Sequence, residues 1–467
     1  MAIPSPAFHK RIHEGLSNAF LQEALRRATK TAVASRDKAF SILPGAEEVR
    51  DRARAIRAHT IANLDHYLEL FAREVERRGG KVFWASTAQE ACTYVVNLAR
   101  ARGVSLIAKS KSMVSEEVGL NHALEAAGIR VVETDLGEFI IQLAGERPSH
   151  ITAPAIHKRR EDVSELFQKH LGMPPTLEIP VMTATARQAL RQIFLDANMG
   201  ISGVNFGIAE TGTLVLVTNE GNGRMVTTLP PIHVALMGIE RVVPTWEDTE
   251  ILLRLIARSA SGLPLTAYVS FLTGPRRPEE PDGPEELHVV LVDNGRSRWL
   301  GTPMEEALYC IRCGACLNAC PVYQAIGGHA YNSVYPGPIG ALVTPMLWGE
   351  AGIELVYASS LCGACQEICP VRISTPDLLV RWRKESSHLL PAWERAGLWI
   401  YALIARNPRV WELLGRLGTG LLRRLGRDGW MRRGIGPLQA WTSVRDLPLP
   451  QRPAFRDWWK SRNGGAR

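Results

Sequence analysis

The strongest constraint on this chain of 467 residues is a run of closely spaced cysteines that ends in a proline. The run comprises Cys310, Cys313, Cys316 and Cys320, with Pro321 directly after it. The spacing C-x2-C-x2-C-x3-C-P is typical of bacterial ferredoxins, whose cysteines hold [4Fe–4S] clusters. The run differs from a zinc site, which usually has two separated C-x-x-C pairs. A set of disulfides is also not expected, because disulfides are rare in a reducing compartment. The run therefore predicts an iron–sulfur domain.

A second, similar run follows and is one cysteine shorter. Its members are Cys362, Cys365 and Cys369, with Pro370 after them. When the two Cys-Pro pairs are aligned, Ser359 takes the place that Cys310 has in the first run. The segment 321–361 between the runs is longer than in a compact ferredoxin. It predicts helices between the motifs, as in α-helical ferredoxin domains.

The two runs are expected to share their ligands. In two-cluster ferredoxins the last cysteine of each run binds the other cluster. On that pattern, a [4Fe–4S] cluster is held by Cys310, Cys313, Cys316 and Cys369. A second cluster has only Cys320, Cys362 and Cys365. We expect this second cluster to be [3Fe–4S], or [4Fe–4S] with one iron bound by Ser359, water, a substrate or a partner.

Length and composition describe a multidomain globular protein. The mass is 51.5 kDa, with 46% hydrophobic and 22% charged residues, and about three domains are expected at roughly 150 residues each. This composition excludes a wholly disordered chain, and eight cysteines are too few for a disulfide scaffold. The first residues lack the pattern of a signal peptide, and the uncharged stretch 321–349 contains prolines and glycines that do not suit a membrane helix. We expect a cytoplasmic protein.

Four regions are predicted along the chain. Residues 1–80 have apolar residues at helical spacing, which predicts two or three helices. Residues 81–300 alternate apolar strands with helices, which favours an α/β domain with a buried, mostly parallel sheet. Residues 301–390 form the iron–sulfur domain, and residues 391–467 form a C-terminal tail. The candidate strands are 81–85, 104–108, 130–134, 213–218, 241–244, 266–271 and 288–293, and the candidate helices include 115–127 and 247–259.

The positive charge of the protein lies in the tail. Residues 391–467 contain 15 Lys+Arg and 5 Asp+Glu, a net charge of +10, whereas the remaining 40 Lys+Arg and 42 Asp+Glu give −2. The tail also holds seven of the twelve tryptophans. Its apolar residues recur every three or four positions with arginines beside them, which favours amphipathic helices. Such helices suit an anionic membrane surface or a partner subunit.

Several longer motifs resemble one protein family. They are 311–323 (IRCGACLNACPVY), 326–331 (IGGHAY), 335–341 (YPGPIGA), 361–365 (LCGAC), 108–113 (AKSKSM), 134–138 (TDLGE) and 207–213 (GIAETGT). Together they are similar to LutB, the iron–sulfur protein family of lactate utilisation. The resemblance covers nearly the whole chain, includes all seven cluster cysteines and extends to the serine at position 359.

The resemblance implies a fold and a function. The α/β region is expected to be a LUD domain, similar in fold to the sugar-phosphate isomerase and CoA-transferase group. The protein is expected to be an electron-transfer subunit that oxidises L-lactate to pyruvate together with two partner proteins.

A small-molecule site in the α/β region is a second hypothesis. Lys109 and Lys111 follow a candidate strand, at the edge where open α/β sheets bind ligands. The resemblance implies a functional carboxylate at Glu210. The full set of candidates is Lys109, Lys111, Glu210, Asn219, Glu220, Asn222 and His233. The alternative is a solvated loop for the lysines and a turn with a capping acid for Glu210.

The number of electrons released by lactate oxidation implies a further cofactor. Oxidation of lactate releases two electrons, whereas an iron–sulfur cluster carries one at a time, so a two-electron acceptor such as a flavin is expected. The chain has no credible G-x-G-x-x-G or Walker A motif, so the flavin is expected in a partner. Two alternatives stay open. One is an enzyme that acts alone through the LUD site with structural or regulatory clusters, and the other is a nucleic-acid-binding protein that uses the tail.

Overall fold

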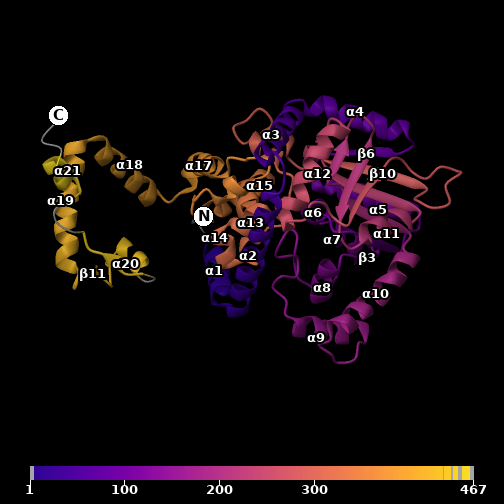
Figure 1. Ribbon diagram of the computed structural model, residues 1–467, viewed down its shortest axis with the longest axis horizontal. Helices are drawn as coiled ribbons and strands as arrows, with labels where there is room; N and C mark the ends of the chain where they lie inside the picture. Colours follow the sequence, from indigo (N-terminus) through magenta and orange to yellow (C-terminus); the bar gives the residue numbers. More distant parts are fainter. Residues whose placement is uncertain (1–4, 435, 443–444, 451–454, 463–467) are drawn as a thin grey trace. The chain divides into compact units, whose positions relative to one another are not determined.

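The computed structural model describes residues 5–434, 436–442, 445–450 and 455–462. The chain divides into two compact units, Met1–Ser386 and Ser387–Arg467. The first unit contains the N-terminal helices, the α/β domain and both cysteine runs (Figure 1). The finer domain boundaries at 80, 300 and 390 stay predictions.

Four helices precede the first strand, one more than the sequence predicts at most. Ser5 Oγ accepts the Phe8 N–H at 3.2 Å and Asn18 Oδ1 accepts the Leu21 N–H at 3.0 Å, so each polar side chain begins a new helix. The expectation of two or three helices was wrong because these caps lie inside one continuous apolar pattern. The helices are α1 (Pro6–Ser17), α2 (Ala19–Ser41), α3 (Ala46–Ala62) and α4 (Leu64–Arg77).

The α/β domain is built on a six-stranded parallel sheet with strand order β1-β10-β7-β4-β2-β3. A buried parallel sheet is what the near-continuous apolar strands predict. Every residue of the central strand β7 is buried. The strands are β1 (Lys81–Ala85), β2 (Leu106–Lys109), β3 (Arg130–Glu133), β4 (Met199–Gly203), β7 (Ile232–Gly238) and β10 (Glu286–Val292).

Helices cover both faces of this sheet. One apolar cluster joins the strands to α5, α6 and α7, and another joins them to α8 and α10. Cys92 belongs to the first cluster as a buried apolar residue, and its thiol donates to the Val118 carbonyl at 3.2 Å. The predicted helix 115–127 is interrupted at Gly119, where φ is +72°. The helices are α5 (Ala88–Ala101), α6 (Met113–Val118), α7 (Leu120–Ala126), α8 (Leu136–Ala144), α9 (Arg160–Leu171), α10 (Ile179–Asp196) and α11 (Asn222–Thr228).

A second sheet, with strand order β8-β5-β6-β9, was not foreseen. The candidate strands 213–218, 241–244 and 266–271 belong to this sheet and not to the parallel one. The central strands β4 and β7 were missed. In β4, a Cβ atom at Gly200 would overlap the Val226 carbonyl oxygen of α11, so the close packing of this helix requires a glycine. In the sequence alone a glycine suggests a turn, and the strand was missed for that reason. The new elements are β5 (Phe206–Ile208), β6 (Thr213–Thr218), β8 (Val242–Val243), β9 (Tyr268–Leu272) and α12 (Trp246–Ser261).

Short helices surround the cysteines, as the long segment between the runs predicts. Helix α15 is buried from Gly337 to Met346 and forms the core of this region. Within the described residues, Gly337–Tyr357 is the single stretch long and apolar enough to cross a membrane, and 67% of its apolar window is buried inside the molecule. The helices are α13 (Ala315–Ala319), α14 (Pro321–Ile326), α15 (Gly337–Trp348), α16 (Ala364–Ile368) and α17 (Thr375–Glu385), with 3₁₀ turns at Ser297–Trp299, Glu305–Tyr309, His329–Tyr331, Gly349–Tyr357 and Ser386–Leu389.

The unit Ser387–Arg467 is helical and exposes its apolar side chains. None of the residues of α18 and α19 is buried. Trp393 is 75% exposed and Trp399 is 65% exposed, although both are large apolar residues. The elements are α18 (Ala392–Arg406), α19 (Pro408–Leu425), β11 (Trp430–Met431), α20 (Pro437–Thr442), β12 (Leu447–Pro448) and α21 (Phe455–Arg462). This unit therefore has little apolar core of its own.

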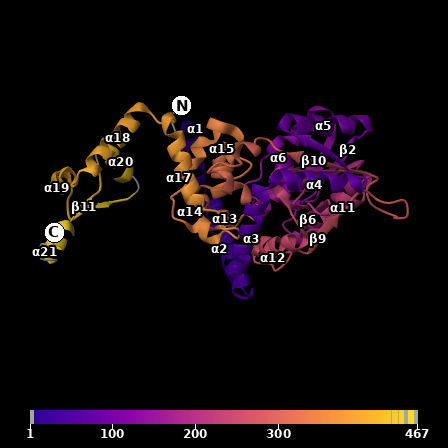
Figure 2. The same ribbon diagram turned by 90° about the horizontal axis from the view of Figure 1, so that it is seen from above.

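Helices α2 and α3 run between the α/β domain and the cysteine region (Figure 2). From α3, the guanidinium of Arg57 is buried and bonds to backbone on both sides. It donates to the carbonyls of Val242 at 3.0 Å and Leu308 at 3.1 Å, and also to those of Glu240 and Tyr309. One side chain therefore joins β8 of the α/β domain to the residues that lead into the first cysteine run.

We expect Arg57→Met to destabilise the first unit by about 3 kcal/mol or more, because four buried carbonyls would lose a charged donor. Chemical unfolding followed by circular dichroism measures the change. Arg52→Met on the exposed side of the same helix is the matched control and should change stability by less than about 0.5 kcal/mol. Equal stability of the two variants would contradict the role assigned to Arg57.

Candidate metal centre and adjoining cavity

The first cysteine run folds as a tight loop held by two left-handed residues. Arg312 has φ +59° and Gly314 has φ +78°. The Arg312 N–H donates to Cys310 Sγ at 3.3 Å. Backbone N–H groups aimed at sulfur are a common feature of iron–sulfur sites, where they stabilise the charge of bound thiolates.

The second run repeats this backbone. Leu361 has φ +55° and Gly363 has φ +87°, at the positions that match Arg312 and Gly314. The Leu361 N–H donates to Ser359 Oγ at 3.1 Å. Ser359 therefore accepts the same local hydrogen bond that Cys310 accepts in the first run, and it stands where the eighth cysteine of a double motif would stand.

The seven thiols gather in two groups, and each group draws on both runs. Burial, followed by the charges of Cys310 and Cys369, raises the pKa of Cys313. Burial, followed by the charges of Cys320 and Cys362, raises the pKa of Cys365 to about 11. The last cysteine of each run thus lies near the first cysteines of the other. Helices α13 and α16, which follow the two loops, pack against each other.

The thiol groups fit an iron–sulfur cluster better than a single ion. All the cysteines are free. Among the described residues, no three of these sulfurs lie within 4.8 Å of one another. A tetrahedral zinc ion would place its sulfurs about 3.8 Å apart, given Zn–S bonds of about 2.3 Å. The larger spacing and the N–H donors to sulfur suit a larger thiolate-bound centre.

Arginines surround the first group of thiols. Arg241 donates from Nη1 to the Cys310 carbonyl at 2.9 Å, and the Arg312 guanidinium lies 4.3 Å from the ring centre of Tyr335. The Arg312 guanidinium pairs with the buried carboxylate of Glu240. Arg296 bridges Glu240 and Glu117. Burial opposes ionisation of Glu240, but Arg296 and Arg312 outweigh it and hold the pKa of Glu240 low, at about 2.

A cavity of about 990 Å³ lies beside these arginines. Its polar side consists of residues that follow β2, β4 and β7 at their carboxyl ends, including Lys111, Asn205 and Arg241. This is the crevice at which the strand order reverses, between β2 and β4, and open α/β sheets bind ligands there. The opposite wall contains Cys313 of the first cysteine run. The cavity and the thiol group therefore share a wall.

The predicted LUD-site residues divide between the cavity and its surroundings. Those that line the cavity are Lys111, Asn219, Glu220 and Asn222. Lys109 is buried in an ion pair with Glu133 and Glu116. His233 is buried against Ser202 Oγ at 2.8 Å. Glu210 accepts the Trp246 N–H at 2.8 Å at the start of α12, which is the position of a capping acid.

Sequence reasoning missed several cavity residues. Arg312 lies inside the cysteine run and could have been found there. Tyr335 begins the motif 335–341 but was not identified as a site residue. Arg241 and His150 carry no local signal and reach the cavity only through the fold. Lys111 Nζ lies 3.4 Å from the Glu138 carboxylate and makes no hydrogen bond within the described residues. Burial raises the pKa of Glu138 to about 7, although the Lys111 charge opposes this shift.

Fold and site together define an iron–sulfur protein in which ferredoxin-type cysteine runs are joined to an α/β domain with a ligand-sized cavity. Comparison with known families agrees. Family models match the LUD domain at residues 68–292, a 4Fe-4S dicluster domain at 306–373, and the C-terminal domain of lactate utilisation protein B at 383–464.

Full-length relatives show the family. "Lactate utilization protein B" of Oceanobacillus iheyensis is 46% identical over 98% of this chain and 97% of its own length. The protein of the same name from Bacillus licheniformis is 45% identical over 99% and 98%. The chain belongs to the lactate utilization protein B family. A solved structure, a DUF162 family protein from Deinococcus radiodurans, covers 49% of this chain and 98% of its own at 15% identity and a TM-score of 0.27.

Proposed function

We propose that this protein is the iron–sulfur electron-transfer subunit of a multi-protein complex that oxidises L-lactate to pyruvate. The observation that carries the proposal is the pair of thiol groups, each built from both cysteine runs and each with a backbone N–H that donates to sulfur. The names of its relatives support a place in lactate utilisation. A bound iron–sulfur cluster supplies one-electron transfer. The chain's own part is to hold the clusters in place.

The ligand sets follow from the two thiol groups. We assign a [4Fe–4S] cluster to Cys310, Cys313, Cys316 and Cys369. A second cluster, [3Fe–4S] or [4Fe–4S], is assigned to Cys320, Cys362 and Cys365, with Ser359 beside the open position. The proximity of Cys369 to Cys310, and of Cys320 to Cys362, supports this exchange.

The α/β domain is proposed to share its architecture with the sugar-phosphate isomerase and CoA-transferase group. Its parallel sheet, covered on both faces, and the cavity at the carboxyl ends of the strands support that relation. In such a domain the ligand site and the strand ends coincide.

We expect protein purified without oxygen to hold seven or eight irons, in line with seven cysteine ligands. Cys313→Ser should lose the iron of one cluster and Cys365→Ser that of the other, because each removes a ligand from a different group. Iron analysis and electron paramagnetic resonance of both variants measure this. Zinc in place of iron, at two or fewer ions per chain, would overturn the proposal.

The substitution Ser359→Cys is the matched gain-of-ligand control. Because Ser359 already accepts the local N–H that Cys310 accepts in the first run, a thiol there should complete the second site. The variant should contain one more iron if the second cluster is [3Fe–4S], and its oxidised resonance signal should disappear. An unchanged iron count and spectrum would show that the alignment of the runs is wrong.

The cavity beside Cys313 is proposed to bind a flavin nucleotide, which the sequence alone assigned to a partner. Its volume of about 990 Å³ is at the upper end of ligand pockets, which span about 300–1,000 Å³. Lys111 offers a buried Nζ that is paired with Glu138 at 3.4 Å but makes no hydrogen bond among the described residues. Small residues of α2 such as Ala28 form an apolar wall. A two-electron carrier next to a one-electron centre is the arrangement that lactate oxidation requires.

Flavin mononucleotide should bind the purified protein, and Lys111→Ala should weaken binding about tenfold or more, because a charge-assisted hydrogen bond contributes about 1.5–3 kcal/mol. Fluorescence titration measures the affinity. Lys169→Ala on exposed α9 is the control and should bind as the wild type does. Equal affinity of the wild type and both variants, or no binding by the wild type, would reject the flavin site. The electron-transfer role is tested separately by the iron content.

The C-terminal unit is proposed to dock on the anionic inner face of the membrane, so that the protein is cytoplasmic and peripheral. A net charge of +10 and the exposed tryptophans of α18 support this location. Each basic residue near an anionic surface contributes about 1 kcal/mol, and tryptophan favours the interface. Such docking would bring the clusters near membrane quinones as electron acceptors. No nucleic-acid partner is expected.

Full-length protein should float with anionic vesicles at low salt and be released at high salt, because screening weakens the attraction. Zwitterionic vesicles are the control and should retain much less protein. Protein truncated after Leu390 should not float. If the full-length protein fails to float, and truncation instead removes the partner subunits, the unit binds a partner and not the membrane.

A further inference from the structure

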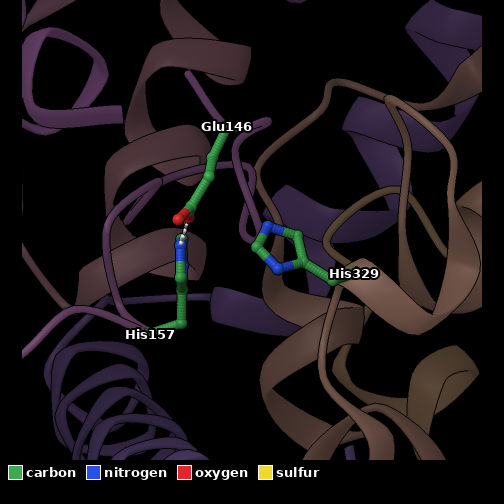
Figure 3. Close-up of side chains that lie close together, drawn as sticks. All are labelled: Glu146, His157 and His329. Atoms are coloured by element: carbon green, nitrogen blue, oxygen red, sulfur yellow. Dashed lines mark hydrogen bonds and ion pairs between the residues drawn. The ribbon is translucent and has the colours of Figure 1, made fainter. Parts of the chain in front are cut away.

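A cluster of three metal-ligating side chains lies apart from the cysteines. Glu146, His157 and His329 each offer one ligand atom, and these atoms lie within 4.8 Å of one another. Figure 3 shows the His329 ring facing the Glu146–His157 pair. Glu146 follows α8, His157 precedes α9, and His329 begins a 3₁₀ turn in the iron–sulfur region. The three residues therefore come together only in the folded chain.

His329 is held in one tautomer. Its Nε2 lies 2.7 Å from the Arg147 carbonyl oxygen. A carbonyl oxygen only accepts, so Nε2 carries the proton and donates it. In the neutral ring, Nδ1 then carries the free lone pair, which is what a metal ion binds. Metal-bound histidines commonly have their second nitrogen fixed by a backbone carbonyl in this way.

His157 has the same kind of support on its far side. Its Nδ1 lies 2.8 Å from Ser149 Oγ, and the Ser149 hydroxyl is placed to donate to the Pro154 carbonyl at 3.3 Å. Nε2 lies 2.8 Å from Glu146 Oε2. Without a metal, a neutral ring carries its proton on Nε2 and donates it to Glu146, while Nδ1 accepts from Ser149. With a metal, the ring proton moves to Nδ1, where Ser149 Oγ accepts its hydrogen bond, and Nε2 becomes the ligand nitrogen.

The two segments that supply the ligands are packed tightly together. A Cβ atom at Gly328 would overlap the Ser149 carbonyl oxygen, so this glycine allows the loop of His329 to approach that of His157. The same carbonyl accepts the hydroxyl of the buried Tyr323 at 2.8 Å. The ligand positions are thus fixed by packing that the metal does not have to create.

We propose that Glu146, His157 and His329 form a divalent metal site of the zinc type, separate from the cysteines. Two imidazoles and one carboxylate are the protein ligands of open zinc sites, which leave a coordination position for water or substrate. That position has room here, because the cluster lies on the wall of a cavity of about 390 Å³. A bound ion would also join the α/β domain to the iron–sulfur region through His329.

The test is zinc binding. The protein is purified without oxygen so that the clusters stay in place, and it is treated with EDTA to remove zinc that is already bound. The wild type should take up one zinc ion per chain. Isothermal calorimetry measures the affinity and the number of ions bound. Ser149→Ala should weaken zinc binding about 10- to 100-fold, as is usual for a residue that supports a ligand.

Three variants complete the test. His329→Ala and Glu146→Gln should each abolish stoichiometric zinc uptake while iron content and circular dichroism stay unchanged, and two different ligands guard against a folding defect in either one. His170→Ala on exposed α9 should bind zinc as the wild type does. The proposal would be overturned if the wild type did not bind zinc, or if both ligand variants bound zinc as tightly as the wild type does.

Discussion

The structure depends on a network of buried charges beside Cys310. Four guanidinium groups and two carboxylates meet where the α/β domain joins the first cysteine run, and they leave a net charge of +2. Their members are Arg57, Arg241, Arg296, Arg312, Glu117 and Glu240. An uncompensated buried charge costs several kcal/mol. A [4Fe–4S]²⁺ centre with four thiolates carries roughly −2, so a cluster at this site would neutralise the excess. The domain contact and the cluster would thus stabilise each other.

This contact also explains the position of the cavity. The arginines occupy the carboxyl ends of the central strands, where the reversal of strand order leaves a crevice. In an isolated α/β domain the crevice would be open to solvent. Here the loop of Cys313 forms one of its walls, so any ligand bound in the crevice lies beside the first thiol group. The redox role proposed for the domain rests on this shared wall and not on its sheet alone.

The contact of Ser149 with Gly328 is a second junction between the same two parts of the chain. It brings two histidines and a carboxylate together, and His329 of this cluster follows α14, whereas Cys320 directly precedes that helix. The two junctions make the α/β domain and the cysteine region one compact unit. In the C-terminal unit, helices α18 and α19 have no buried residue, and their exposed apolar side chains suit a surface supplied by another partner.

The sequence by itself determined the iron–sulfur motifs, the missing eighth cysteine and the buried parallel sheet. These features are local, because the cluster ligands lie within a short segment of chain and because runs of apolar residues indicate buried strands. Tertiary structure alone decided that β4 and β7 are central strands, because Gly200 is explained only by the packing of α11. It also decided that Lys111 faces the cavity while Lys109 is buried in an ion pair. Neighbouring residues leave a strand end in different directions, and side chains far apart in the chain, such as His157 and His329, meet only when the domains pack.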